Sequence, residues 1–145
     1  MRNGFTLTEL LVVLLIVAVL TALGAQSVRH VLDRIAVDRA VNELTAFYHG
    51  ARLAAVLRGR RVRVEFSADS LVGVYEGATD STFLNTAGPS AGGVALTVSR
   101  AVIRLRPDGI GLGAANTKLV VRRGEAADSL AISRLGRIRR IRSNR

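Results

Sequence analysis

The feature that most constrains this chain is an unbroken apolar run close to its amino terminus. Leu10 to Leu20 are eleven consecutive apolar residues, and further apolar residues extend the stretch from Phe5 to Ala25, which is 21 residues long. A helix needs roughly 20 such residues to cross a hydrocarbon core of about 30 Å, so residues 5–25 are predicted to form a membrane-spanning helix. Glu9 interrupts the run, and a carboxylate in hydrocarbon costs about 2.5 to 3.5 kcal/mol. This residue therefore needs a partner or a specific role.

Three interpretations of this segment use its polar residues differently. In a secretory signal peptide, Arg2 is the basic region, the apolar run is the hydrophobic region, and residues 22–24 supply a small-residue cleavage site. In a simple membrane anchor, Glu9 lies among the lipid headgroups. The third interpretation depends on the order of residues 2–10, and it is the one that the sequence favours.

In residues 2–10, Gly4, Phe5 and Glu9 stand at fixed offsets directly ahead of the apolar helix. This arrangement resembles the processing site of type IV prepilins and type II secretion pseudopilins. The resemblance implies a leader, residues 1–4, which a prepilin peptidase removes by cleaving after Gly4, and methylation of the new amino terminus at Phe5. Glu9 is then expected to pair with the Phe5 ammonium of a neighbouring subunit. A buried ion pair is better attested as a device that sets register than as a source of stability.

The charges that flank the span predict one orientation, and the resemblance implies the other. Arg29, Arg34 and Arg39 follow the span whereas only Arg2 precedes it, so the positive charges predict a cytoplasmic globular domain. The resemblance implies a single-pass protein of the bacterial inner membrane with its globular domain outside the cytoplasm, later incorporated into a pilus or pseudopilus. We adopt the second orientation, because the peptidase of that family acts on the cytoplasmic face.

Residues 26–59 continue the helix with an amphipathic pattern. Apolar residues recur at steps of three and four positions between residues 28 and 55, and charged residues of both signs occupy the other face. Gly59 is the expected C-cap. The pattern predicts one helix over residues 5–58, and the apolar stripe of its second half must be covered by another element.

The hydrophobic period changes to two in residues 60–145, which predicts a β-rich globular domain. Residues 77–93 are rich in small residues and are predicted to be a mobile loop, and Pro107-Asp108-Gly109 is predicted to be a turn. The fold class is therefore α+β, with the helix packed on a small antiparallel β domain. The expected strands are 62–66, 71–76, 94–98, 102–106, 118–122, 130–134 and 137–141.

Three stretches carry a resemblance that covers most of the chain. They are residues 47–64, residues 103–109 with their proline-glycine turn, and residues 130–139 with the sequence Gly136-Arg137-Ile138-Arg139. In these stretches the chain is similar to the GspH/FimT family, which comprises minor pseudopilins of type II secretion and minor pilins of type IV pili. The resemblance implies a pilin-like fold and assembly with other pilin or pseudopilin subunits through the N-terminal helix.

The last twelve residues contain six arginines and no acidic residue. These side chains form either a solvated basic tail or a nucleic-acid contact. The resemblance implies the second, because some T-type fimbrial minor pilins bind DNA through a matching Gly-Arg-x-Arg signature. It carries that role to Gly136, Arg137 and Arg139, with Arg140 as an addition. Since the segment has no aromatic residue for stacking on bases, the expected ligand is double-stranded DNA bound through its phosphates without sequence preference. The six arginines are Arg134, Arg137, Arg139, Arg140, Arg142 and Arg145.

The sequence offers little for catalysis, cofactors or metals. It has no Cys and two His, which excludes thiolate chemistry and Cys-ligated metal sites. Gly109, Gly111 and Gly113 suggest a dinucleotide loop, but they lead into a strand-like segment and not a helix, so a glycine-rich turn is the better interpretation. His30 and Asp33 share a helix face but lack further ligands, and both histidines, His30 and His49, are interpreted as surface residues. We therefore predict that the protein is not an enzyme and holds no cofactor or metal.

Overall fold

The computed structural model describes residues 6–142, and within residues 22–26 it describes the backbone alone. The chain divides into two compact units, Met1–Leu32 and Asp33–Arg145. Helix α1 (Leu7–Arg58) contributes to both. Within the described residues, no helix combines the length and the apolar character needed to cross a membrane. Phe5 and the side chains of residues 22–25, which belong to the predicted span, lie outside that description.

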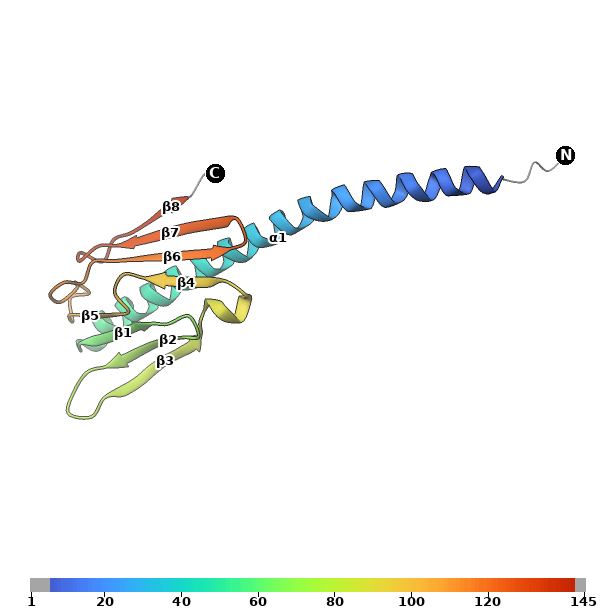
Figure 1. The fold of residues 1–145 in the computed structure, drawn as a ribbon. Coiled ribbons are helices and arrows are strands. Elements are labelled where there is room, and N and C mark those ends of the chain that lie inside the picture. Colours follow the sequence, from blue (N-terminus) through green and yellow to red (C-terminus); the bar gives the residue numbers. More distant parts are fainter. Residues whose placement is uncertain (1–5, 143–145) are drawn as a thin grey trace. The chain divides into compact units, whose positions relative to one another are not determined.

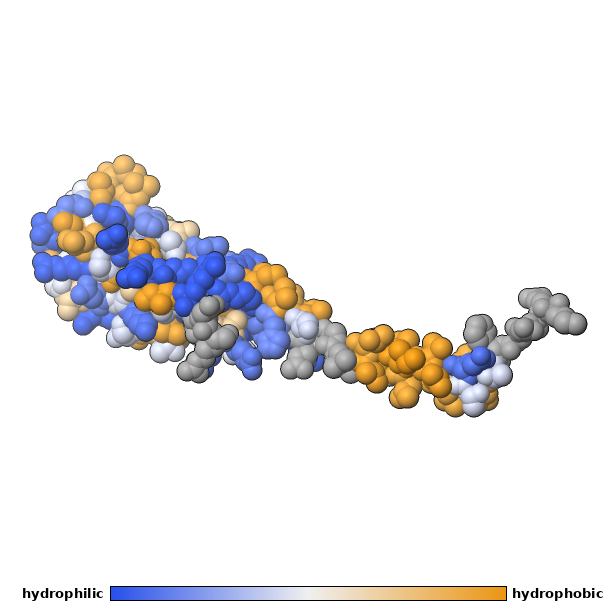
Figure 2. All heavy atoms as spheres, turned by 90° about the horizontal axis from the view of Figure 1, so that it is seen from above, coloured by the Kyte–Doolittle hydropathy of each residue, from blue (hydrophilic) through white to orange (hydrophobic). Residues whose placement is uncertain are grey.

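Apolar side chains form a continuous exposed stretch in the middle of the first unit, with polar side chains on either side of it (Figure 2). From Leu10 to Leu20 every Leu, Ile and Val is at least half exposed, so no other part of the unit packs on them. Exposed apolar residues continue along α1 through Val28, Val31, Leu32 and Ile35. The sequence pattern predicted that another element covers the stripe of the second half, and among the described residues this cover begins at Val37.

The second unit contains the remaining helix and two antiparallel sheets of four strands each (Figure 1). The order of strands in the first sheet is β3-β2-β1-β5, and in the second it is β4-β6-β7-β8. The strands of the first sheet are β1 (Val62–Phe66), β2 (Ser70–Tyr75), β3 (Ser81–Ala87) and β5 (Val102–Leu105). Those of the second are β4 (Ala95–Val98), β6 (Thr117–Arg123), β7 (Ala126–Ile132) and β8 (Ile138–Arg142).

The core of this unit forms where the second half of α1 lies along the inner faces of both sheets (Figure 1). Helix residues at three- and four-residue steps meet strand residues at two-residue steps, which is how each element buries one face. The predicted helix packed on antiparallel strands is therefore confirmed. The buried helix residues are Val37, Ala40, Val41, Leu44, Phe47, Tyr48, Ala51 and Ala55, and fully buried strand partners include Val62, Val64, Leu105, Leu119 and Val121.

Helix α1 ends as the sequence predicted. Gly59 has a φ of +60°, its N–H donates to the Val56 carbonyl at 3.3 Å, and the Arg60 N–H donates to the Ala55 carbonyl at 3.2 Å. This pair of hydrogen bonds is a Schellman motif, which satisfies carbonyls that the helix end leaves unpaired. The chain reverses there and enters β1.

The predicted mobile loop over residues 77–93 is wrong. It contains β3 and a short 3₁₀ helix, η1 (Pro89–Gly92). The Phe83 ring packs on the Tyr75 ring with centroids 4.3 Å apart, next to Gly73, where a Cβ would lie only 2.8 Å from the Phe83 ring. The sequence around this pair is rich in small residues and therefore did not predict a strand. Strand β3 is ordered by its pairing with β2. Strand β7 likewise begins at Ala126, four residues before the predicted start.

Candidate functional site

Glu9 takes part in the start of α1. Thr6 N–H donates to Glu9 Oε2 at 2.9 Å, and Glu9 N–H donates to Thr6 Oγ1 at 3.3 Å. This reciprocal pair is a capping box, in which two residues three positions apart satisfy free amides of the first helical turn. The spacing Thr6-x-x-Glu9 is the sequence signal for this capping box. Gly4 and Phe5, the predicted processing residues, lie outside the described residues.

Arg140 is held in ion pairs at the interface between β8 and α1. In the register of β7 and β8 it lies opposite the buried Leu130, so it shares the face of the sheet that packs on the helix. Its guanidinium pairs with Asp38 of α1 and with Asp128 of β7, and Nε donates to Asp128 Oδ2 at 2.8 Å. Arg34 adds a second pair to Asp128, at 3.1 Å. The predicted DNA contact at Arg140 is thus a side chain engaged within the fold.

The electrostatics of this cluster favour its charged form. The Asp128 side chain has no exposed surface, and its charge is matched by two guanidinium groups, as a buried carboxylate requires. The hydrogen bond from Arg140 holds the pKa of Asp38 below its ordinary value. These contacts join β8 to α1 through residues that are 102 positions apart in the chain.

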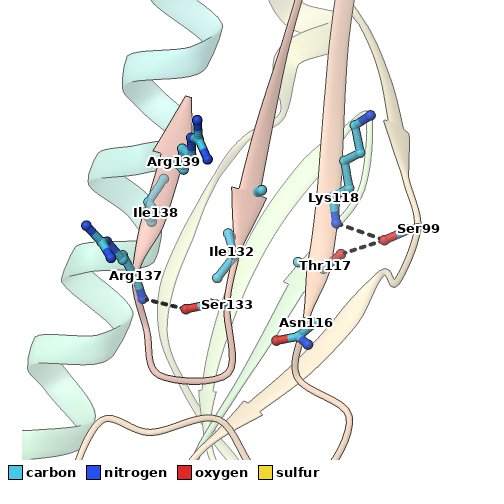
Figure 3. A pocket seen from close by; sticks show the side chains of 10 residues that line it. Ser99, Asn116, Thr117, Lys118, Ile132, Ser133, Arg137, Ile138 and Arg139 are labelled. Carbon is cyan, nitrogen blue, oxygen red and sulfur yellow. Dashed lines mark hydrogen bonds between the residues drawn. The ribbon is translucent and has the colours of Figure 1, made fainter. Parts of the chain in front are cut away.

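Arg139 lies on the opposite, outward face of the same sheet, and Arg137 stands directly before β8. Arg139 pairs in register with Ala131 of β7, and Ala131 pairs with Lys118 of β6. Both arginines and Lys118 are exposed, and they line one groove together with residues of the neighbouring strands (Figure 3). The structure therefore brings two of the three predicted arginines together and adds a cation that sequence reasoning missed. Lys118 could have been found from the alternation of buried and exposed residues in β6, because this alternation places its side chain on the outward face.

Gly136 has a role in the turn between β7 and β8. It has a φ of +78°, and a Cβ on it would lie 2.9 Å from Arg52 Nε. Gly109 also has a positive φ, of +75°, and its carbonyl accepts a hydrogen bond from Arg52 Nε at 3.1 Å. Arg52 of α1 therefore packs against two turns that only glycine fits. The glycine of the predicted signature shapes the turn that positions Arg137.

The other candidates of the sequence have structural roles. The segment with Gly109 and Gly113 turns with positive φ values and leads into β6, which confirms the glycine-rich turn. Asp33, considered with His30, forms an ion pair with Arg123 at 2.9 Å. Among the described residues no group of three or more His, Cys, Asp or Glu is placed to hold a metal ion.

Comparisons with known proteins match both parts of the chain. The family described as Type II transport protein GspH matches residues 40–136, and the prokaryotic N-terminal methylation motif matches residues 1–25. No curated protein matches the chain in sequence.

Two kinds of solved structure share its fold. The type IV minor pilin FimU of Pseudomonas aeruginosa is similar with a TM-score of 0.62 and 18% identity, over 73% of this chain and 88% of FimU. The minor pseudopilin EpsH from the Type 2 Secretion System of Vibrio cholerae is similar with a TM-score of 0.59 and 10% identity, over 73% of this chain and 96% of EpsH.

Proposed function

Because the chain belongs to the GspH family of type II transport proteins, we propose that it is a minor pilin or pseudopilin, a subunit of a type IV pilus or a type II secretion filament. The observation that carries the proposal is the methylation motif over residues 1–25, which ends in the apolar half of α1. A protein of this kind acts by assembly, and the proposed role needs no enzymatic activity.

In this proposal the protein is made with a short leader and matures at the inner membrane. A prepilin peptidase cleaves after Gly4 and methylates Phe5, and the globular unit lies outside the cytoplasm. The exposed apolar side chains of α1 support this step, because a surface of this kind is stable only when lipid or other helices cover it. Assembly with other pilin or pseudopilin subunits covers it in the filament.

Terminal sequencing of the membrane-embedded protein tests the proposal directly. The expected mature chain begins at a methylated Phe5. A Gly4→Ala variant is expected to keep its leader and to stay out of filaments, while Asn3→Ala is the matched control and is expected to be processed normally. A mature chain that begins near Ala25 contradicts the proposal, because the segment is then a secretory signal peptide.

A second candidate function is binding of double-stranded DNA, which would suit a pilus that takes up DNA. The observation in its favour is that Arg137 and Arg139 are exposed and line one groove, with no carboxylate partner among the described residues. Binding through phosphates alone predicts little dependence on sequence and a strong dependence on salt, with a slope of log affinity against log salt near −0.9 per contact.

Paired substitutions separate this function from general attraction to a basic protein. Arg137→Gln with Arg139→Gln is expected to weaken binding of a DNA duplex. It is also expected to lower the magnitude of the slope of log affinity against log salt by about two, because two phosphate contacts are lost. Arg58→Gln with Arg61→Gln removes the same charge from other exposed positions and is the control. Equal losses in the two double variants contradict a defined DNA site.

A further inference from the structure

Strand β3 forms one edge of the first sheet, and its side that faces away from β2 is open (Figure 1). Among the described residues, the backbone of β3 makes no hydrogen bond other than those of its pairing with β2. Since alternate N–H and C=O groups of an edge strand point away from its neighbour, β3 offers a row of free donors and acceptors. The opposite edge, β5, is covered, because Gly111 pairs with Leu105 and the Leu112 N–H donates to the Arg104 carbonyl at 2.8 Å.

The composition of β3 leaves this edge unprotected. Charged residues, proline and short length are the usual devices that keep an edge strand from pairing with another chain. The seven residues of β3 include no charged residue and no proline, whereas β8 carries three arginines and β4 has only four residues. A bulge at Phe83 interrupts the pairing of β3, but the four residues from Leu84 to Ala87 pair with β2 without interruption. Of the four sheet edges, β3 is therefore the one best suited to an added strand.

The side of α1 next to this edge is apolar and exposed. Leu84 of β3 faces the helix, because it pairs with the buried Gly73 and its Cδ2 lies 3.9 Å from the position of a Cβ on Gly50. Leu53 and Leu57 follow Gly50 by three and seven positions, so they lie on the same side of the helix, and they are 57% and 73% exposed. We call Gly50, Leu53 and Leu57 the shelf. A strand about 4.8 Å beyond β3 directs every second side chain onto the shelf and covers its leucines.

The two ends of this edge carry opposite charges. At the start of β3, the Arg60 guanidinium lies 5.3 Å from the ring centroid of Tyr75, which pairs with Ser81. At the other end, Gly88 follows β3, and its N–H donates to the Asp69 carbonyl at 2.9 Å. Within the described part of the chain, neither Arg60 nor Asp69 has an ion-pair partner. A strand antiparallel to β3 therefore fits best with a basic residue at its start, beside Asp69, and an acidic residue at its end, beside Arg60.

From these observations we propose that β3 and the shelf bind one extended strand of a different protein, which adds to the first sheet antiparallel to β3. The partner strand has apolar side chains at alternate positions, a basic residue at its start and an acidic residue at its end. A second copy of this chain suits the site less well, because each copy carries a net charge of +10 and β3 has no charged residue to pair with Arg60 or Asp69. The inference goes beyond the proposed function and does not depend on DNA binding.

A synthetic peptide tests strand addition on the full chain in a nonionic detergent. The probe is a fluorescently labelled peptide with the sequence Lys-Thr-Val-Thr-Val-Thr-Glu, and fluorescence anisotropy measures its Kd. Since only alternate amides of an added strand face β3, N-methylation of one alternate set is expected to weaken binding about tenfold, whereas N-methylation of the other set changes it little. No binding of the unmethylated peptide at millimolar concentration, or equal effects of the two methylation patterns, overturns the proposal.

The charges at the two ends of the edge give a second test. A peptide with the end residues exchanged, Glu-Thr-Val-Thr-Val-Thr-Lys, has the same composition and is expected to bind several-fold more weakly. In the double variant Arg60→Gln with Asp69→Asn, the two peptides are expected to bind equally. Equal affinities for the two peptides in the parent overturn the assigned direction of the strand and its charges.

Matched variants of two exposed leucines test the contribution of the shelf. Leu57→Ser is expected to weaken binding of the first peptide several-fold. Leu135→Ser is the control, because Leu135 is 70% exposed and lies in the turn between β7 and β8 of the other sheet, and it is expected to leave the affinity unchanged. Urea midpoints near that of the parent check that both variants fold. Equal losses of affinity in the two variants contradict the docking site.

A cysteine variant distinguishes a different protein from a second copy of this chain. The sequence has no Cys, so Asn85→Cys places a single thiol on β3. Under mild oxidation this variant is expected to stay monomeric, and the first peptide with its central Thr or Val replaced by Cys is expected to form a disulfide with it. A disulfide-linked dimer of the variant that the unmodified peptide suppresses overturns the assignment, because a second copy then occupies the edge.

Discussion

The carboxylate of Glu9 has a local task that is independent of any neighbouring subunit. It caps the first turn of α1 through Thr6, and the proposed pairing with the Phe5 ammonium of another subunit uses the same side chain. The two tasks have different chemical requirements, because a capping box accepts Gln in place of Glu whereas the ion pair needs the charge. Substitutions at this one residue and at its cap partner can therefore separate them.

We expect Glu9→Gln to preserve the helix start and membrane insertion but to reduce incorporation into filaments at least tenfold, since the charge is lost and the cap is kept. Thr6→Val is the converse control. It removes the cap at a cost of about 1 kcal/mol but keeps the carboxylate, so incorporation is expected to stay near that of the parent. Quantitative blotting of sheared filaments measures both. Wild-type incorporation of Glu9→Gln contradicts the register role.

Gly136→Ala is expected to destabilise the second unit by about 1 to 2 kcal/mol, because its φ of +78° is unfavourable for a residue with a Cβ and that Cβ meets Arg52. Gly92→Ala is the matched control, since Gly92 has no positive φ and its Cβ meets nothing within 4 Å. Urea unfolding followed by circular dichroism measures the difference. Equal midpoints for the two variants contradict the proposed role of this turn.

Among the strands, β8 lies at the edge of its sheet and is fixed both by a neighbouring strand and by α1. It pairs with β7 along one side, and the ion pairs of Arg140 join it to α1 and to the buried Asp128. Exposed edge strands invite pairing with other chains, and arginines along an edge reduce that tendency. The alternation of β8 thus gives its arginines two tasks, since Arg140 anchors the strand while Arg139 faces outward.

The anchor of β8 predicts a dependence of stability on pH. The pKa of Asp38 is lowered in the fold by its hydrogen bond to Arg140, so the unfolded chain takes up a proton at this residue more readily. The stabilisation is complete above the ordinary pKa of Asp, near 4, and is lost as the pH falls through the lower pKa of the folded state.

Urea midpoints measured between pH 2 and pH 6 are therefore expected to fall on the acidic side, and Asp38→Asn is expected to flatten part of that decline. Asp80, whose pKa is lowered by Arg63, acts in the same direction, so some slope remains in this variant. An identical pH profile in Asp38→Asn and the parent contradicts the anchor.

At the scale of the whole chain, a net charge of +10 is unevenly distributed over the two sheets. On the outer face of the first sheet, Arg63 and Arg104 pair with Glu65, Glu76 and Asp80. On the outer face of the second sheet the cations have no such partners among the described residues. Electrostatic attraction of an anionic ligand is therefore expected at the second sheet, and ordinary salt-bridged surface at the first.

The exposed apolar residues of α1 lead to a prediction about assembly. Val31 and Ile35 are 58% and 57% exposed, so they contribute little to the stability of an isolated chain. Ile35→Ser is expected to change the free energy of unfolding by no more than about 0.5 kcal/mol and to reduce incorporation into filaments severalfold. Arg29→Gln changes an exposed polar residue on the same helix, and as the control it is expected to leave incorporation into filaments unchanged. A large loss of stability in Ile35→Ser contradicts this interpretation, because the residue then packs within its own chain.

The features that could be predicted from the sequence depend on local interactions. The helix and its end at Gly59 follow from three- and four-residue periodicity and from a Schellman motif within six residues. The strands with a clear two-residue alternation, such as β1 and β6, follow from burial of one face. The processing motif depends on neighbours a few positions apart. Each of these signals is short in range, so no knowledge of the tertiary structure is needed to find it.

Which arginines of the last strand are available to a ligand depends on contacts between residues that are distant in the sequence. The sequence shows six arginines with no acid nearby, but the acids that neutralise Arg140 come from α1 and β7. The register of β8 decides which arginines are exposed, because side chains alternate between the two faces of the sheet and the helix covers one of those faces. The same reason places Lys118 opposite Arg139, since hydrogen bonding between strands brings together residues that the chain itself keeps 21 positions apart.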